Sequence, residues 1–320
     1  MTDFTEERRG TMNISVAVVH GMGPFREDFY KDFERRLKKR LAKLNPDVRL
    51  TVDGVYWSDI PDRLEDRLWE KANVEQLRWK QVTPWIPLRS IFIHYLGDAI
   101  AYQPVSGRAS GKPDNFIPAG SIYEDIHERF AQTLSRLADK AGGDAPLCVV
   151  SHSLGTVIAS NYFYDLQHRK MAVKARRVMG TDASRLERGE TLTHFYTLGS
   201  PIALWTLRHD DFGIPIRVPC PEMSSRGNAI GEWVNFYDKD DIIAYPIKNL
   251  SRQYNAAVTE DLEINCAGFR SWTPFAHGMY FKTKSVLNRI AASLNRLAAE
   301  MESFHQAAAG KEPRAVISKR

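Results

Sequence analysis

Residues 147–161 read LCVVSHSLGTVIASN, and this stretch decides the fold that we expect for the chain. The apolar run at its start has the length and composition of a buried strand, and the residues after Ser153 are typical of a helix. A serine flanked by small residues at a sharp turn from strand to helix has its hydroxyl lifted out of the backbone. The stretch therefore predicts that Ser153 is a nucleophile.

Strand-like and helix-like segments alternate on both sides of this stretch. Short β-branched or apolar runs predict strands at 14–19, 48–57, 147–150, 193–198, 233–237 and 257–266. Apolar residues at helical spacing predict helices at 29–44, 121–141 and 286–301, and another directly after Ser153. The alternation predicts an α/β fold whose mostly parallel central sheet is covered by helices. We expect one domain over residues 1–320, with a polar C-terminal tail at 306–320.

Two segments interrupt the alternation. Residues 58–120 are rich in aromatic residues and include a Gly-, Pro- and Ser-rich loop. We expect them to form a helical, aromatic-rich cap over the pocket, because insertions on α/β scaffolds usually lie over the site. A subdomain packed around its own aromatic core is the alternative. Residues 169–190 are charged and aperiodic, and we expect a surface excursion there.

Composition narrows the class of protein. The formal net charge is +5, but charges of both signs are interleaved and no nucleic-acid motif accompanies them, so we expect no nucleic-acid partner. Three cysteines without CxxC spacing favour reduced thiols. With no secretory signal and no run approaching the roughly 18 apolar residues of a membrane span, we expect a cytoplasmic protein. A peripheral membrane contact through the cap stays open, as does the oligomeric state. No HExxH or similar spacing occurs, and we expect neither metal nor other cofactor.

A serine nucleophile needs a base that takes its proton and an acid that orients the base. The loops after the strands expected at 14–19, 147–150, 193–198 and 233–237 meet at the carboxyl ends of the sheet, where sites collect. The loop at 238–241 offers carboxylates in the required chain order of nucleophile, acid and histidine. Only His277 and His305 follow this loop, and His305 lies at the far end of the last expected helix. His277 is therefore the expected base.

Five stretches together resemble the serine lipases and esterases of the α/β-hydrolase superfamily: VVHGMG, VVSHSLGTVIAS, FYTLGSP, VNFYDKDDII and AHGMY. They extend from about residue 14 to residue 282, and the 58–120 insertion has no counterpart in the resemblance. The resemblance implies Ser153 as nucleophile, His277 as general base and an acid in the 238–241 loop. Asp241 is similar to the lipase pattern of an aspartate before an apolar pair, and Asp238 is the alternative acid. One departure is Ser151, which replaces the usual glycine and creates a rival hydroxyl.

Acyl transfer also needs hydrogen-bond donors for the oxyanion of the tetrahedral intermediate. The backbone N–H of Leu154, at the start of the helix, is one expected donor. The N–H of Met22 in the HGMG loop is the other. His20 is expected to brace that loop rather than to act as a base, and His152 to be a packing residue.

These features predict a serine hydrolase that cleaves carboxylic esters, of a small molecule or a lipid, through an acyl-enzyme. A thioesterase or an acyltransferase would use the same groups. The alternative from another class is a scaffold or membrane-associating protein that keeps the fold without the activity. The aromatic insertion and the basic helix at 29–44 favour that alternative, whereas the complete set of catalytic residue types argues against it.

Overall fold

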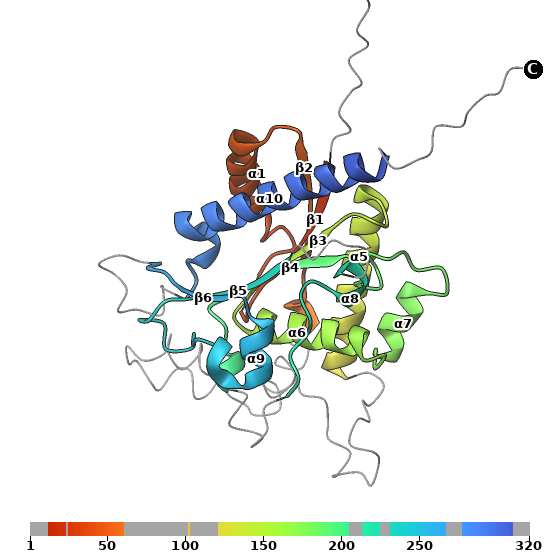
Figure 1. Cartoon of the computed structure of the whole chain (residues 1–320). Coiled ribbons are helices and arrows are strands. Elements are labelled where there is room, and N and C mark those ends of the chain that lie inside the picture. Colours follow the sequence, from red (N-terminus) through yellow and green to blue (C-terminus); the bar gives the residue numbers. More distant parts are fainter. Residues whose placement is uncertain are drawn as a thin grey trace, which may run out of the picture.

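The computed structural model describes residues 12–23, 25–60, 102, 121–204, 213–224, 231–266 and 277–309. At its centre is a six-stranded sheet in the order β2-β1-β3-β4-β5-β6, in which every neighbouring pair is parallel (Figure 1). The strands are β1 (Met12–Val19), β2 (Val48–Val55), β3 (Leu147–His152), β4 (Leu192–Leu198), β5 (Glu232–Tyr237) and β6 (Glu260–Glu263). The predicted α/β fold with a mostly parallel sheet is confirmed, and each strand overlaps its predicted segment.

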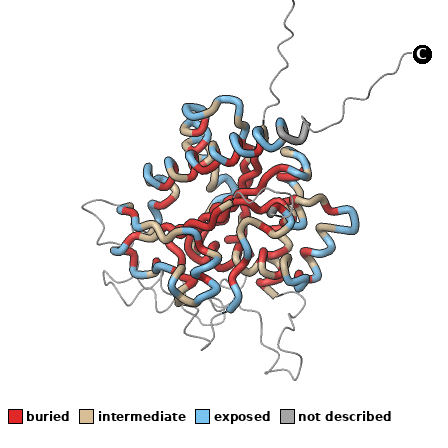
Figure 2. Tube along the Cα trace, viewed as in Figure 1, coloured by how far each residue is buried: buried red, intermediate tan, exposed pale blue. Residues whose placement is uncertain are grey.

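The central strands are buried on both faces, as Figure 2 shows. Every residue of β3 and β4 is buried, whereas β6, at the edge of the sheet, is half-exposed. Strands with helices on both sides need apolar residues at successive positions, not at alternate ones. This explains the continuous apolar run LCVV with which β3 begins.

Helices cover both faces of the sheet. One face packs against α1 (Lys31–Leu44) and α10 (Lys284–Ala309), and the other against α5 (Ile122–Ala141), α6 (Leu154–Gln167) and α7 (Val173–Met179). Alternate residues of β1 supply the two cores, because successive side chains of a strand point to opposite faces. The remaining elements are short: α8 (Pro221–Ser224), η3 (Lys248–Leu250), α9 (Arg252–Ala257) and η5 (Tyr280–Lys282).

The direction in which successive strands are added to the sheet reverses at one point, between β1 and β3. The chain moves from β1 outward to β2, then returns past β1 to β3 and continues in the opposite direction. Ligands of open parallel sheets bind at such a switch point, outside the carboxyl ends of the two strands. Here those two strands are β1, which ends at the HGMG loop, and β3, which ends at Ser153.

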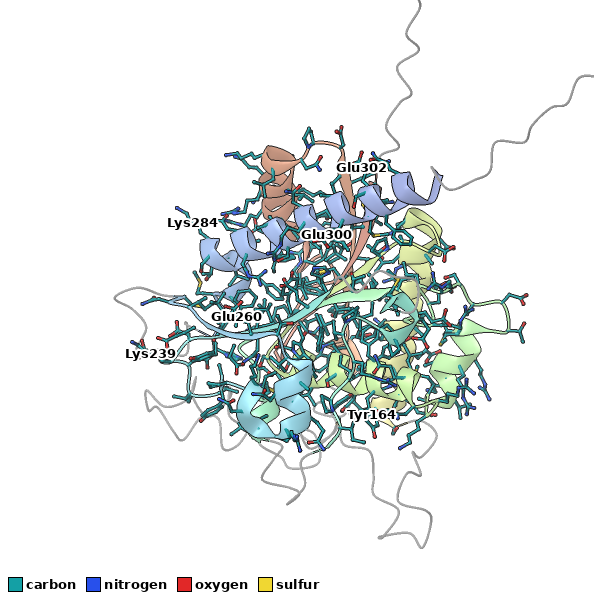
Figure 3. The ribbon with its side chains drawn as sticks, viewed as in Figure 1. Tyr164, Lys239, Glu260, Lys284, Glu300 and Glu302 are labelled. Carbon is teal, nitrogen blue, oxygen red and sulfur yellow. The ribbon has the colours of Figure 1, made fainter. Side chains whose placement is uncertain are left out.

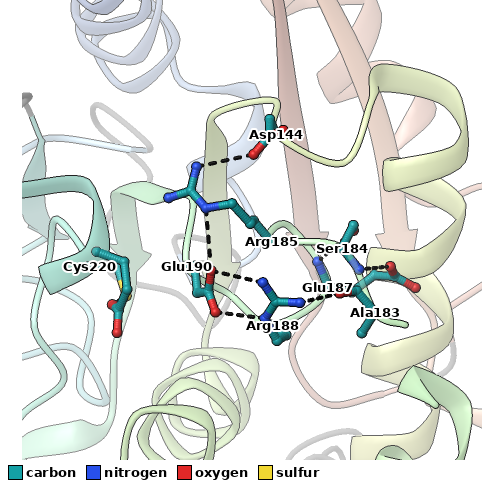
Figure 4. A network of polar contacts seen from close by, with 9 residues as sticks. Asp144, Ala183, Ser184, Arg185, Glu187, Arg188, Glu190 and Cys220 are labelled. Atoms are coloured by element: carbon teal, nitrogen blue, oxygen red, sulfur yellow. Dashed lines mark hydrogen bonds and ion pairs between the residues drawn. The ribbon is translucent and has the colours of Figure 1, made fainter. Parts of the chain in front are cut away.

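The expectation of a surface excursion at 169–190 is wrong. The segment contains α7, and both Ala175 and Leu186 are fully buried. Ion pairs hold its second half (Figure 4): Arg185 contacts Asp144 at 3.1 Å and Glu190 at 3.3 Å. Helix α7 has only seven residues, three of them basic, so its apolar periodicity is too short to be recognised in the sequence.

Two predicted segments, the C-terminal tail at 306–320 and the cap at 58–120, extend beyond the described residues. Helix α10 continues to Ala309, so residues 306–309 are helical instead of forming the start of a tail. Residues 310–320 lie outside the described part of the chain, as does the expected cap except for 58–60 and Tyr102. The cap therefore stays a prediction.

The surface over α1 and α10 is strongly polar. Lys284, Glu300 and Glu302 project from α10 into solvent (Figure 3). Between α1 and α10 lies a groove of about 830 Å³, lined by Arg35, Arg36, Lys39, Arg40, Lys43, Leu44, Asn288, Ala291 and Ala292. Among the helices of the described residues, none combines the length and the apolar character that crossing a membrane requires.

Candidate active site

Ser153 occupies the turn between β3 and α6. Its backbone has φ 52° and ψ −130°, a region that residues other than glycine rarely adopt. Such a conformation costs on the order of 1–3 kcal/mol and persists only where the surroundings enforce it. Here the Ser153 N–H donates to the carbonyl of Leu198 (2.9 Å), and the Ser153 carbonyl accepts from the hydroxyl of Thr156 (2.7 Å). The turn that the sequence predicts is therefore present and is held from both sides.

Two glycines allow the HGMG loop to lie directly against this turn. A Cβ on Gly155 would stand 2.3 Å from the carbonyl oxygen of His20, and a Cβ on Gly21 would stand 2.6 Å from the Cβ of Ser153. No real side chain tolerates such distances, so at Gly155 main chain meets the main chain of His20, and at Gly21 main chain meets Cβ of Ser153 directly. The end of β1 and the start of α6 thus form a common floor beneath Ser153.

Three side chains from separate segments form a hydrogen-bonded series. The Oγ of Ser153 lies 2.7 Å from Nε2 of His277, and Nδ1 of His277 lies 2.7 Å from Oδ2 of Asp241. A carboxylate only accepts hydrogen bonds, so Nδ1 carries the proton and Nε2 presents its lone pair to the serine hydroxyl. The side chain of His277 is 19% exposed and that of Asp241 only 1%. This arrangement can remove the proton of Ser153.

The environment of Asp241 favours its ionised form. Burial alone would raise its pKa, but the hydrogen bond and charge of His277, the N–H of Ile243 and the hydroxyl of Tyr280 together lower it. The Tyr280 hydroxyl donates to Oδ2 of Asp241 at 2.9 Å and accepts from the N–H of Asp238 at 3.0 Å. Tyr280 lies three residues after His277, within the stretch AHGMY, but sequence reasoning gave it no role.

The two rival candidates have other partners. Asp238, the alternative acid, accepts from the N–H of Cys266 at 2.7 Å and from that of Asp240 at 3.0 Å, so it braces its own loop. Ser151, the rival hydroxyl, is fully buried and donates to the carbonyl of Tyr196 at 3.0 Å. The structure thus brings Asp241 and Ser153 to His277.

The expected oxyanion donors are at the same place. Leu154 is the first residue of α6, and Met22 follows the glycine that touches Ser153. Neither of their backbone N–H groups donates a hydrogen bond within the described part of the chain. The first N–H groups of a helix have no partner inside the helix and favour negative charge. Leu154 is at such a position, and among the described residues no acceptor competes for either amide where it would hold an anionic oxygen.

His20 is a structural residue of the HGMG loop. The N–H of Trp57 donates to its Nε2 (3.0 Å), so Nδ1 carries the proton and donates to the carbonyl of Gly21 (2.6 Å). The imidazole also stacks on the Trp57 indole, with 4.9 Å between centroids. Complete burial lowers the pKa of His20 to about 3. Its lone pair is used and it does not face Ser153, as the sequence predicts.

The parallel sheet, its switch point, the strand-to-helix turn at Ser153 and the chain order serine, aspartate, histidine all occur together. This is the α/β-hydrolase fold. No family model matches the chain, and no curated protein matches it either.

Solved structures of two esterases are similar to it. An esterase of the hyperthermophilic archaeon Pyrobaculum calidifontis is 12% identical, over 91% of this chain and 77% of that one, with a TM-score of 0.40. A fungal esterase of Rhizomucor miehei is 11% identical, over 92% and 78%, also with a TM-score of 0.40. Similarities at this level carry no argument about what this chain does.

A second histidine–aspartate pair, His127 and Asp165, lies between α5 and α6 of the hydrolase fold. Together with Tyr102 and Tyr123 it forms a group of four side chains that we call the helix cluster. Nε2 of His127 lies 3.0 Å from the Tyr102 hydroxyl, and the Tyr123 hydroxyl donates to Asp165 at 2.8 Å. Nδ1 of His127 is 3.6 Å from Asp165, beyond hydrogen-bond distance, and has no partner among the described residues. Sequence reasoning did not identify this cluster.

Burial sets the protonation of the helix cluster. It lowers the pKa of His127 to about 3 and raises that of Asp165 to about 6, although Tyr123 and Lys170 act in the opposite direction on Asp165. Across the described residues, no group of three or more His, Cys, Asp or Glu side chains could hold a metal ion.

Proposed function

We propose that this chain is a serine hydrolase that cleaves carboxylic esters through an acyl-enzyme. The observation that carries the proposal is the unbroken series from Ser153 through His277 to Asp241, with 2.7 Å at both steps. Such distances are within the range in which a base activates a hydroxyl nucleophile. The backbone amides of Met22 and Leu154 also support the proposal. They lie next to Ser153 and donate to no acceptor among the described residues.

In the first half-reaction, Oγ of Ser153 attacks the carbonyl carbon of the ester and its proton passes to Nε2 of His277. Asp241, buried and ionised, stabilises the imidazolium that forms and keeps it oriented. The N–H groups of Met22 and Leu154 hold the oxyanion. The intermediate then collapses as the carbon–oxygen bond to the alcohol breaks, and His277 gives its proton to that leaving oxygen.

In the second half-reaction, water attacks the acyl carbon while His277 takes a proton from that water. The bond to Ser153 breaks, the proton returns to Oγ, and a carboxylic acid leaves. Each oxyanion donor contributes about 2.7–4 kcal/mol to lowering the barrier in enzymes of this kind. A thioester could enter the same sequence with a thiol as leaving group, so esters and thioesters of the same acyl group should be compared directly.

The test uses a fluorophosphonate label and a series of p-nitrophenyl esters of increasing acyl length. Wild-type protein should incorporate the label and hydrolyse at least one ester, and Ser153→Ala should do neither. Ser151→Ala is the matched control, because Ser151 is a buried hydroxyl two residues away that does not face His277; it should keep both activities. Wild-type protein that is inert to the label and to every ester would overturn the proposal.

A further inference from the structure

His152 immediately precedes Ser153 and contacts the loop that carries His277. Its Nε2 lies 2.6 Å from the main-chain carbonyl oxygen of His277. Its ring also packs against three neighbours from that loop, with centroid distances of 4.7 Å to His277, 5.7 Å to Tyr280 and 5.4 Å to Phe281. One side chain on the nucleophile's strand therefore reaches both the main chain and the ring of the base.

The hydrogen bond fixes the tautomer of His152. A carbonyl oxygen only accepts, so Nε2 carries the proton and Nδ1 is a lone pair. Nδ1 is buried without a hydrogen-bond partner among the described residues, and it lies next to Gly21, where a Cβ would be 3.1 Å away. A buried polar atom without a partner costs free energy, and this cost is borne at Nδ1 while Nε2 makes the one hydrogen bond of the side chain among the described residues, to His277.

Among the described residues, which do not include 267–276, the main chain at His277 has little other support. Within the described residues, the bond from His152 is the only hydrogen bond that reaches the backbone N–H or carbonyl of His277. His277 lies in a turn ahead of η5, outside any helix or strand. A base held only by its ring hydrogen bonds could rotate about its main chain, whereas a tethered carbonyl restricts that rotation.

The groups around His152 also decide its charge. His277 and His20 are the neighbouring imidazoles, and Asp241 is the nearby carboxylate. Complete burial, reinforced by the charge of His277, lowers the pKa of His152 to about 3. His152 therefore stays neutral at neutral pH, so it restrains the base without placing a positive charge of its own beside it.

We propose that His152 is a positioning residue, whose Nε2–H holds the carbonyl of His277 and so fixes the imidazole between Ser153 and Asp241. This inference rests on the proposed function of the site. It assigns to the residue before the nucleophile a task that the packing role expected from the sequence does not include.

The test compares His152→Asn with His152→Gln. The amide of Gln ends near the position of Nε2 and can donate to the carbonyl, whereas the shorter amide of Asn ends near Nδ1 and cannot. We expect His152→Asn to lower kcat by on the order of 10- to 100-fold, with KM within about twofold, because small misplacement of a reacting group is costly. His152→Gln should retain kcat within about threefold of wild type, and both variants should melt at similar temperatures.

A second measurement does not depend on turnover. The proton that Nδ1 of His277 shares with Asp241 should give a downfield NMR signal, assigned by its loss in His277→Gln. We expect that signal to be sharp in wild type and His152→Gln, and broadened or absent in His152→Asn. Equal kcat in His152→Asn and wild type, or equal losses in both variants, would overturn the inference, as would an unchanged signal in His152→Asn. If wild-type protein shows no esterase activity, the proposed function fails and the NMR comparison still decides the role of His152.

Discussion

The Ser153 site and the helix cluster contain the same kinds of group in the same order, yet only one is suited to catalysis. Each has a hydroxyl on one histidine nitrogen, an aspartate near the other, and a tyrosine that donates to the aspartate. The difference lies in geometry and access. The histidine–aspartate distance is 2.7 Å at the site and 3.6 Å in the cluster, and His277 is partly exposed while His127 is fully buried.

The pKa values of the two aspartates also distinguish the Ser153 site from the helix cluster. Donors around Asp241 lower its pKa against the effect of burial, whereas burial raises the pKa of Asp165 to about 6. The hydroxyls differ too, because Ser153 is an aliphatic alcohol on a strained turn and Tyr102 is a phenol packed between aromatic rings. A histidine beside an aspartate is therefore no base for catalysis unless the carboxylate lies within hydrogen-bond distance and substrate can approach.

The largest expected effect is on turnover. Asp241→Asn should reduce kcat by on the order of 10⁴-fold, because an amide in this position favours the wrong tautomer of His277. Asp165→Asn, the same change in the helix cluster, should leave kcat within about twofold. Ester hydrolysis by both variants measures the contrast. Comparable losses in the two would mean that the cluster takes part in catalysis.

The next effect is on acid stability. Burial lowers the pKa of His20, His127 and His152 to about 3, and that of His194 to about 4. These groups stay neutral in the folded chain, whereas the unfolded chain binds their protons as the pH falls below 6.5, so the stability they contribute is lost with acidification. Asp165 acts oppositely between its ordinary pKa of 3.8 and about 6. These four histidines and Asp165 should together take up about three protons net on unfolding near pH 5, which contributes about 4 kcal/mol per pH unit.

Denaturant unfolding at several pH values measures this slope. In His127→Gln it should fall by about 1.4 kcal/mol per pH unit, because one proton is removed from the balance. Activity should stay near that of wild type at neutral pH. An unchanged slope would mean that His127 is protonated in the folded chain.

The smallest expected effect is a change in folding stability that comes from Asp165 alone. Its raised pKa means that the folded state binds a proton more tightly than the unfolded state, so stability is lost as the pH rises from about 3.8 to about 6. Asp165→Asn should therefore stabilise the protein at pH 7 by about 2–3 kcal/mol, with the gain vanishing near pH 4. Denaturant midpoints at the two pH values test this. A variant that is destabilised at pH 7 would show that the ionised carboxylate is needed.

The sequence was sufficient for the sheet and for much of the site geometry. Short apolar or β-branched runs marked the strands because strands buried on both faces are largely apolar, and HGMG and SHSLG marked the two loops at the switch point. The choice between Asp238 and Asp241 needed coordinates, since both follow the same strand and only the path of the loop brings one of them to His277. The helix cluster escaped notice because α5 and α6 bring His127 and Asp165 together from positions 38 residues apart.

The floor beneath Ser153 has a consequence for how such a protein could be altered. At Gly155 the main chain lies directly against the carbonyl of His20, and at Gly21 it lies directly against Cβ of Ser153, with no room for a side chain at either position. Any larger residue at Gly21 or Gly155 would therefore move the backbone beneath the serine. Laboratory selection for altered activity should retain glycine at both positions while other residues around Ser153 vary.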